Sequence, residues 1–589
     1  MAANGPLLGD GTRRSKGDQA RRYNLLAARL IAELVKNSLG PRGLEKMFID
    51  VMGEVTITKD GATLLRKIDV EHPAAKILIE ASNAVDNEVG DGTTSVVVLA
   101  GALVQKVEEL LDMGIAPSTI SDGYLRGLDI ALEALDDISQ KYDNADRQAM
   151  QRLARTCLQS KALAYGGDGV AGLVVDAICS IANFGGNSLD IDDIKIEEKA
   201  GNMIDTQLVR GIVIDKTIDS SAMPRAVENA RIMLIDDELE GKRTRTDAEI
   251  RITSPDQIKS YSDAQTLMIK SKVQHIIDSG ANAVFSRKGI NTLAQHLLTR
   301  AGILSVRRVK ENDLVWLAKA TGATVSQKLD HEQGDREHHH DHHQLRDHNH
   351  DHHDDHYHHG DIDIKLGHAE RVYEKQVGDD KMVFVEGCEN PKAVTLLLRA
   401  NSKRTLDECH RSALDAISVL RDFIVRPAVV AGGGAAEAAI AKAVREKALL
   451  ISGREQIVIQ KFAEALEEIP LTIARNAGMD VIDTLVQLRS KHSNGKASTH
   501  GVDAIERKVQ EMFPLVIEPA AVKEQVIKTA VEVTNLLVRV DDVLMAKPTM
   551  YSHTHANGAK HSHAGGDREH QHDHFDRLGK QQRPMHHYY

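Results

Sequence analysis

The stretch from Gly90 to Ser95 reads Gly-Asp-Gly-Thr-Thr-Ser and runs directly into an apolar segment, Val96–Gly101. This pattern predicts a glycine-rich loop at the start of a helix, where backbone N–H groups attract anions and glycine allows close approach. A carboxylate repels bare phosphate, so Asp91 fits such a loop mainly as a ligand for Mg²⁺ that bridges to a polyphosphate. The alternative is a glycine-rich turn whose Thr and Ser side chains cap the helix.

Three further segments could complete a nucleotide pocket. Leu39-Gly40-Pro41 ends a predicted helix in a tight turn that can admit a flat base or a phosphate. Gly432-Gly433-Gly434 precedes a long predicted helix, which makes a second anion-binding helix start. Glu518 follows a strand-like run, and its carboxylate could hold ribose hydroxyls. No Gly-x4-Gly-Lys-Ser/Thr string is present, which excludes an ordinary P-loop ATPase.

Hydrolysis of a nucleotide also needs a group that orients and deprotonates water opposite the γ-phosphate. Two aspartates are candidates: Asp60 at the start of a predicted helix, and Asp415 inside one. A lone aspartate on a helix is usually a solvated surface residue, and the spacing leaves that alternative open for Asp415.

The elements that must position these residues fall into three regions. Residues 18–39 and most of 73–142 have helical periodicity, and a β-hairpin is expected between them over residues 46–58. From about residue 166 strand-like and helical segments alternate, which predicts an α/β module. From residue 405 to about 546 the chain is expected to be helical again. The α/β module is therefore expected to be inserted into one discontinuous helical domain.

The composition limits the number of domains, the kind of core and the class of partner. The 589 residues are too many for one core, and two to four domains are expected. Aromatic residues make up 3%, so aliphatic side chains on helices must build the cores. The formal charge of -12 argues against nucleic acid as a partner.

The cysteines and the apolar runs indicate where the protein works. Cys157, Cys179, Cys388 and Cys409 are widely separated, which argues against a zinc site or a disulfide framework and favours a reducing compartment. The first residues lack an apolar signal core, and no run of about eighteen apolar residues occurs. We therefore expect a cytoplasmic protein with no membrane partner.

Two segments, 331–360 and 551–589, hold 22 of the 29 histidines and share nearly the same Gly-Asp-Arg-Glu-His string. Their polar, low-complexity composition predicts disorder. His and Asp at this density can bind Zn²⁺, Ni²⁺ or Cu²⁺ loosely, so a metal-sequestering assembly is one alternative function.

Several strings together resemble the group II chaperonins, closest to the archaeal thermosome, a relative of eukaryotic TRiC. They lie in the same order as in that family over about residues 8–547. These strings are Asn37–Met47, Lys59–Thr63, His72–Lys76, Asp86–Thr94, Ile252–Gln257, Val306–Lys310, Val383–Lys392, Val430–Ala435 and Val516–Pro519.

The resemblance implies a multidomain α and α/β fold. Residues 1–147 and 422–547 would form a discontinuous α-helical equatorial domain, and 148–216 and 393–421 an intermediate domain. Residues 217–392 would form an α/β apical domain that binds unfolded protein. The apical domain would carry a helical protrusion near 239–274 as a built-in lid, and the histidine-rich insertion 331–360. Residues 548–589 would be a disordered histidine-rich tail.

The resemblance also assigns roles residue by residue. Asp91 would hold Mg²⁺, and Asp60 and Asp415 would position and activate water. Lys161 would sense the γ-phosphate and couple hydrolysis to lid closure. Lys59 replaces the Asn usual in group II members, and it would add a phosphate contact. The remaining residues would contact ATP or ADP: Leu39, Gly40, Pro41, Gly92, Thr93, Thr94 and Ser95, with Gly433, Gly434, Asp503 and Glu518 on the base or ribose side.

The implied activity is an ATP hydrolase that encloses unfolded client proteins in a double-ring chamber and folds them in cycles. Identical or paralogous subunits would form stacked rings of eight or nine. An ATP-independent holdase or scaffold of the same descent is the second alternative, and the presence of Asp60, Asp91 and Asp415 argues against it.

Overall fold

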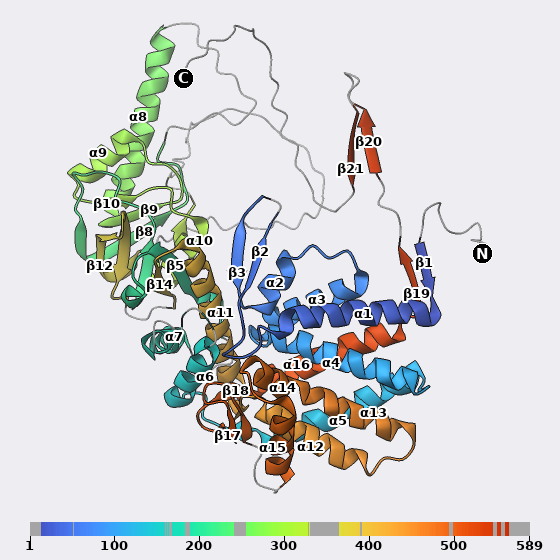
Figure 1. The fold of residues 1–589 in the computed structure, drawn as a ribbon. Coiled ribbons are helices and arrows are strands. Elements are labelled where there is room, and N and C mark those ends of the chain that lie inside the picture. The colour runs from blue at the N-terminus through green and yellow to red at the C-terminus, as the bar shows by residue number, and fades with distance from the viewer. Residues whose placement is uncertain are drawn as a thin grey trace, which may run out of the picture. The chain divides into compact units, whose positions relative to one another are not determined.

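A computed structural model gives the fold (Figure 1). It describes residues 13–50, 52–159, 161, 163, 168–182, 189–240, 255–327, 329, 365–388, 392–493, 499–545, 550–554 and 560–564. The chain divides into two units, residues 24–539 and the two chain ends, 1–23 with 540–589. Residues 24–539 contain three large apolar cores, which we call the helical core, the middle core and the sheet core.

The helical core combines the beginning and the end of the larger unit. Its helices are α1 (Gly17–Lys36, from residue 24 onward), α2 (Gly61–Lys67), α3 (Pro73–Val89), α4 (Thr93–Asp112), α5 (Pro117–Ile138), α12 (Ala435–Ala448), α13 (Arg454–Leu466), α14 (Glu468–Asn476), α15 (Val481–Ser493) and α16 (Ala520–Arg539). The strands adjoining these helices are β2 (Lys46–Ile49), β3 (Val55–Thr58), β4 (Gln140–Lys141), β15 (Ala428–Ala431), β16 (His500–Asp503), β17 (Lys508–Glu511) and β18 (Ile517–Pro519). β15 and β18 also contribute Val429 and Ile517 to the middle core.

Helix α4 lies at the centre of this core because its residues 96–104 are all apolar. Residues 96–104 are all buried, and α3, α13 and α16 pack around them. A helix that is apolar all round is stable only when it is enclosed by other elements. The enclosed helix fixes the position of its own first residue, Thr93, and therefore of the glycine-rich loop before it.

Strand pairing brings two distant segments of the helical core together. β15 lies between β18 and β4 in a three-stranded antiparallel sheet, with Val430 opposite Glu518. The backbone of Val502, in β16, donates a hydrogen bond to Gly433 O at 2.8 Å. The glycine triplet that follows β15 thus lies beside both Glu518 and the strand that carries Asp503.

The middle core surrounds a small sheet in which β14 pairs parallel to β5 and antiparallel to β6. Its helices α6 and α11 lie side by side (Figure 1). The elements are α6 (Arg147–Gln159), α7 (Asp168–Ile181), α11 (Lys403–Val425), β5 (Ile194–Ala200), β6 (Gln207–Val209) and β14 (Val394–Ala400).

The sheet core is built on strands in the order β10-β9-β8-β12-β13-β7, with β11 also paired to β8. Strands β8, β9 and β10 run parallel, and β12, β13 and β7 extend the sheet antiparallel. The elements are β7 (Gly211–Ile214), β8 (Ala226–Ile235), β9 (Ala283–Ser286), β10 (Leu304–Val306), β11 (Val325–Ser326), β12 (Gly367–Val377), β13 (Asp380–Glu386), α8 (Pro255–Asp278), α9 (Thr292–Arg300) and α10 (Glu311–Thr321).

In the unit of the chain ends, β1 (Arg13–Lys16) pairs antiparallel with β19 (Asp542–Met545). β20 (Met550–Thr554) pairs with β21 (Lys560–Ala564), in a tail that its composition predicts to be disordered.

The elements agree with the sequence-based expectations except in the last third. Residues 405–546 were expected to be helical with one strand-like run before Glu518, but they also contain β15, β16, β17 and β19. The prediction was wrong there because a short apolar run such as Ala428–Ala431 has no period that separates strand from helix. Residues 241–254 of the predicted protrusion lie outside the described residues. The histidine-rich segment 331–360 also lies outside them, so the metal-sequestering alternative stays a hypothesis. None of the helices in the described part of the chain has the length and hydrophobicity of a membrane span.

Candidate active site

Two adjoining cavities lie where the helical core meets the middle core. The smaller, about 100 Å³, is lined by charged and hydroxyl side chains, and we call it the polar cavity. The larger, about 480 Å³, has more apolar walls, and its volume suits a small-molecule ligand. They share five lining residues, Leu39, Gly40, Asp91, Gly92 and Ser95.

Every predicted site residue lines one of these cavities. The polar cavity adds Lys59, Asp60, Thr93, Thr94, Lys161 and Asp415 to the shared residues. The larger cavity adds Pro41, Gly433, Gly434, Asp503 and Glu518. Segments up to about 480 positions apart in the sequence therefore converge, although their individual roles stay predictions.

The glycine-rich loop has the backbone geometry of an anion site. Gly92 is the N-cap of α4 with φ +84° and makes no side-chain cap hydrogen bond, and its own N–H donates to Asp91 Oδ1 at 2.8 Å. A Cβ atom on Gly92 would lie 2.7 Å from Val526 Cγ2, so only glycine fits both the conformation and the space. Gly434 likewise caps α12 in the left-handed region without a side-chain hydrogen bond. Two uncapped helix starts thus border the larger cavity.

The turn at Leu39–Pro41 is held from two sides. The side chain of Asn476 donates to Leu39 O at 2.9 Å and to Lys36 O at 3.0 Å. Lys59 Nζ donates to Pro41 O at 3.3 Å, and burial lowers the pKa of this lysine. Lys59 therefore lies at the border between the turn and the polar cavity.

Asp60 is held by several hydrogen bonds. Its carboxylate caps α2, accepting from Thr63 N at 2.7 Å, and it accepts from Thr93 Oγ1 at 2.9 Å. Burial acts to raise the pKa of Asp60, but the hydrogen bonds from Thr63 and Thr93 and the charge of Lys161 outweigh it. The pKa therefore lies below its usual value, and Asp60 stays a carboxylate at neutral pH.

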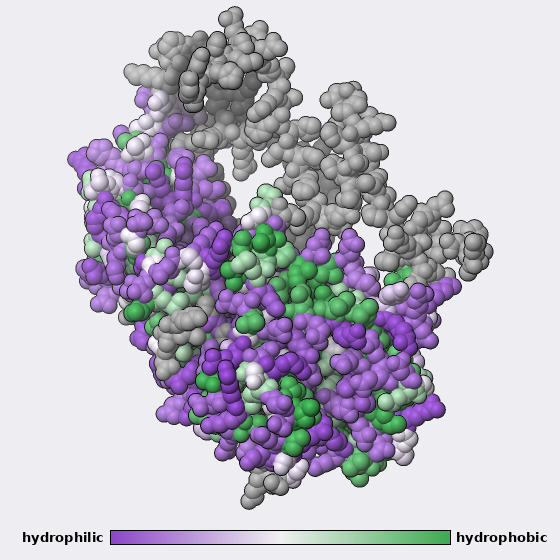
Figure 2. Space-filling view, viewed as in Figure 1, coloured by the Kyte–Doolittle hydropathy of each residue, from purple (hydrophilic) through white to green (hydrophobic). Residues whose placement is uncertain are grey.

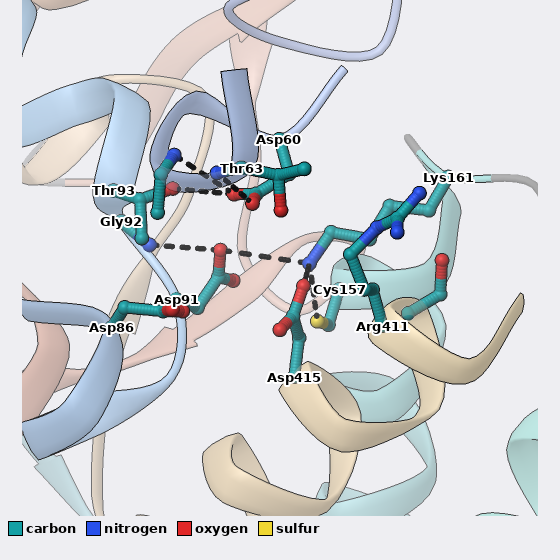
Figure 3. Close-up of polar contacts among 12 residues, drawn as sticks. Asp60, Thr63, Asp86, Asp91, Gly92, Thr93, Cys157, Lys161, Arg411 and Asp415 are labelled. Carbon is teal, nitrogen blue, oxygen red and sulfur yellow. Dashed lines mark hydrogen bonds and ion pairs between the residues drawn. The ribbon is translucent and has the colours of Figure 1, made fainter. Parts of the chain in front are cut away.

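Lys161 and Asp415 form an ion pair inside the polar cavity (Figure 3). Lys161 Nζ lies 2.5 Å from Asp415 Oδ2, 3.8 Å from Asp91 Oδ1 and 3.5 Å from Cys157 Sγ. Burial acts to lower the pKa of Lys161, but Asp415 and Asp91 raise it well above the usual value. Lys161 is therefore a permanent cation beside two carboxylates.

Asp415 is a carboxylate of this cavity that titrates near neutrality. Burial raises its pKa to about 7, and the negative charges of Asp60 and Asp91 act in the same direction against Lys161. A carboxylate with a pKa near the working pH is well matched to accept a proton from water.

In the larger cavity, Glu518 belongs to a buried ionic triad. Lys523 Nζ lies 2.7 Å from Glu437 Oε1 and also pairs with the Glu518 carboxylate. Burial raises the pKa of Glu518, and the charge of Glu437 adds to the effect. Asp503 accepts from Gln510 Nε2 at 2.5 Å and from two backbone N–H groups of its own turn.

The polar cavity also contains residues that the sequence analysis missed. Glu408, Arg411 and Ser412 line it, and all three lie on α11 with Asp415. Residues three, four and seven positions before Asp415 share its helix face, so this spacing could have identified them. Lys523 and Glu437 have no comparable signal, because their pairing depends on tertiary packing.

Comparisons with known proteins agree with this fold. The family model of the TCP-1/cpn60 chaperonin family matches residues 31–548, and the chain belongs to that family. It is therefore a chaperonin, an ATPase whose turnover drives the folding of other proteins.

Within that family, the chain is similar to archaeal thermosome subunits. It is 45% identical to thermosome subunit alpha of Archaeoglobus fulgidus over 92% of this chain and 94% of the relative. It is 43% identical to a thermosome subunit of Pyrococcus horikoshii over 92% and 94% of the two chains. It is 42% identical to thermosome subunit alpha of Saccharolobus solfataricus over 96% and 98%.

Proposed function

We propose that the two cavities together bind ATP and that Asp415 and Asp60 promote its hydrolysis there. One observation carries the proposal: Asp415, from the middle core, enters the same polar cavity as the glycine-rich loop of the helical core. The loop proposed to bind the phosphates and the aspartate proposed to act as the base therefore belong to different parts of the fold.

For binding, the phosphates would lie against the first turn of α4. Gly92, Thr93, Thr94 and Ser95 offer N–H and hydroxyl donors there, and Lys59 and Lys161 supply positive charge. The base and ribose would occupy the larger cavity, between the Leu39–Pro41 turn and the glycine triplet before α12. Asp503 and Glu518 would face that part of the nucleotide.

Asp91 would hold Mg²⁺, which supplies charge neutralisation of the phosphates when bound. Its carboxylate is 39% exposed and lines both cavities. No three ligating side chains among the described residues form a ready-made metal site, so phosphate oxygens and water must complete the shell. That arrangement suits Mg²⁺, which keeps several waters and binds through few carboxylates.

For hydrolysis, Asp415 would accept a proton from the attacking water, and Asp60 would orient that water. The low pKa of Asp60 keeps it an acceptor, while the pKa of Asp415 near 7 lets it take up the proton. Asp415 is 15% exposed, and electrostatic interactions at such a shielded position are stronger than in water.

The three cores support the proposed domains, with the helical core as equatorial, the middle core as intermediate and the sheet core as apical. Asp415 and Lys161 belong to segments of the middle core, so the site is complete only when this core lies against the helical core. Hydrolysis would thereby be tied to a domain motion that closes a lid and encloses the client.

An exposed apolar patch supports assembly into rings. Figure 2 shows it over α1, β2 and β3. Its large side chains are exposed by 38–67%: Leu26, Leu30 and Leu34 on α1, with Leu44, Met47 and Ile49 at β2. A patch of this kind on a chaperonin subunit favours an interface with further copies. We infer stacked rings of eight or nine identical or paralogous subunits, located in the cytoplasm.

The test is refolding of a chemically denatured enzyme in the presence of this protein. We expect recovered enzyme activity with ATP and Mg²⁺, and little recovery without nucleotide. Suppression of aggregation that is the same with and without ATP, with no recovery, would instead support the holdase alternative.

A further inference from the structure

One acidic side chain of the polar cavity has no part in the proposed chemistry. Glu408 on α11 is 13% exposed, and its Oε2 atom accepts from two directions. Thr58 Oγ1 lies 3.2 Å away, and Arg411 donates from Nη2 at 2.6 Å and Nε at 3.1 Å. A buried carboxylate with this many donors has a defined position.

Thr58 links this carboxylate to Asp60. It is the last residue of β3 and is 2% exposed, so water does not compete for its hydroxyl. The backbone N–H of Asp60 donates to Thr58 Oγ1 at 3.1 Å, and that hydroxyl donates in turn to Glu408. The chain of hydrogen bonds therefore joins α11 directly to the segment that carries the second aspartate.

The Thr58–Glu408 hydrogen bond joins the helical core to the middle core, whereas the Lys161–Asp415 ion pair lies within the middle core. Lys161 follows α6 and Asp415 lies on α11, and both helices pack in the middle core. Their ion pair can therefore persist when the middle core moves as one body. The hydrogen bond from Thr58 to Glu408 cannot, because Thr58 lies on a strand of the other core.

Asp415 lies between this contact and a second one on the same helix. Glu408 precedes Asp415 by two helical turns, about 10 Å along the axis. On the other side, Arg421 donates to the backbone O of Glu88 at the end of α3. Because α11 is held at both places, these two contacts fix how far Asp415 extends into the polar cavity.

We propose that the Thr58–Glu408 hydrogen bond positions Asp415 for ATP hydrolysis. Thr58 and Glu408 are positioning residues that act through Asp415 and Asp60. The inference rests on the proposed function, and it adds residues to which the resemblance assigned no role.

Thr58→Val tests the contact with the least change of shape. We expect kcat for ATP to fall about tenfold, because small displacements of a reacting group are costly, while KM changes less than about twofold. Thr58→Ser keeps the hydroxyl and should restore most of kcat. Thr56→Val is the matched control on the same strand: Thr56 pairs with Phe48 across the hairpin and does not line the polar cavity.

Glu408→Ala and the Thr58→Val/Glu408→Ala double variant complete the cycle. If the two residues act through one contact, the double variant loses no more kcat than the worse single variant. A Thr58→Val protein with wild-type kcat, or additive losses, would overturn the inference. A wild-type protein without ATPase activity would instead overturn the proposed function, so the two failures are distinguishable.

Discussion

The ammonium of Lys161 lies 2.5 Å from the carboxylate of Asp415, and their side chains are 14% and 15% exposed. The pair joins a segment after α6 to the middle of α11. It places a fixed positive charge next to the proposed base and 3.8 Å from Asp91. We expect the γ-phosphate to compete for Lys161, which would release Asp415 when nucleotide is present.

The pH dependence of hydrolysis follows from the raised pKa of Asp415. The base works only as a carboxylate, so kcat/KM for ATP, which reports the nucleotide-free protein, should be constant above its pKa of about 7 and fall as the pH drops through that value. At pH 6 the loss should be about tenfold. ATP binding measured over the same range separates a titrating base from lost affinity. A flat kcat/KM down to pH 5.5 would rule out this assignment.

Replacing Lys161 should shift that profile. The charge of Lys161 lowers the pKa of Asp415 in the nucleotide-free protein, so Lys161→Met should raise this pKa and move the acidic limb of kcat/KM to higher pH. At pH 7 we expect kcat/KM about tenfold lower, with the deficit shrinking as the pH is raised. Lys161→Arg keeps the charge and is the control, since the acidic limb of its pH profile should stay closer to that of the wild type. The same apparent pKa in all three proteins would contradict an electrostatic role of Lys161.

Gly92→Ala should destabilise the protein more than a matched substitution at Gly114. Both glycines have positive φ, +84° and +75°, which costs about 1 kcal/mol for alanine. Only at Gly92 does the new Cβ meet a neighbour, Val526, which adds about 1–3 kcal/mol of overpacking. Denaturant unfolding of the two variants measures the difference. Equal losses would mean that the loop before α4 is less constrained than its packing indicates.

Ring assembly should depend on the apolar patch of α1, β2 and β3. Leu30 is 61% exposed in the single chain, and Leu30→Lys should weaken assembly because it puts a charge into a buried interface. Leu450→Lys, at a residue 87% exposed outside this patch, is the control. Sedimentation velocity distinguishes rings from free subunits. Intact rings in the Leu30 variant would exclude this part of the patch as an interface.

Much of this site could be predicted from residue type and spacing. Glycines before an apolar helix predict an anion site, and the structure brings that loop, the Leu39–Pro41 turn and the Gly432–Gly434 segment to adjoining cavities. Each of these glycine-containing turns lies at a helix end, so each could be recognised from its own short stretch of sequence. The resemblance to chaperonins was needed to select Lys161 and Asp503, which have no local signal.

Other parts depend on packing that no local pattern contains. The triad of Lys523, Glu437 and Glu518 joins two helices and a strand, so its members could not be paired from spacing. Strand β15 was missed because four apolar residues fit a helix equally well. Glu408 could have been identified from the sequence, because it lies two helical turns before Asp415. Its partner Thr58 could not, because it is 350 residues away.

Asp415 is proposed to carry out chemistry in a pocket built by other segments. Asp415→Asn tests it most directly, with ATP binding by calorimetry and turnover by phosphate release measured on the same preparation. We predict ATP affinity within about threefold of wild type and a kcat lower by about 100-fold or more, the usual contribution of a general base. Wild-type turnover in this variant would contradict the account, and so would a loss of turnover explained entirely by lost ATP binding.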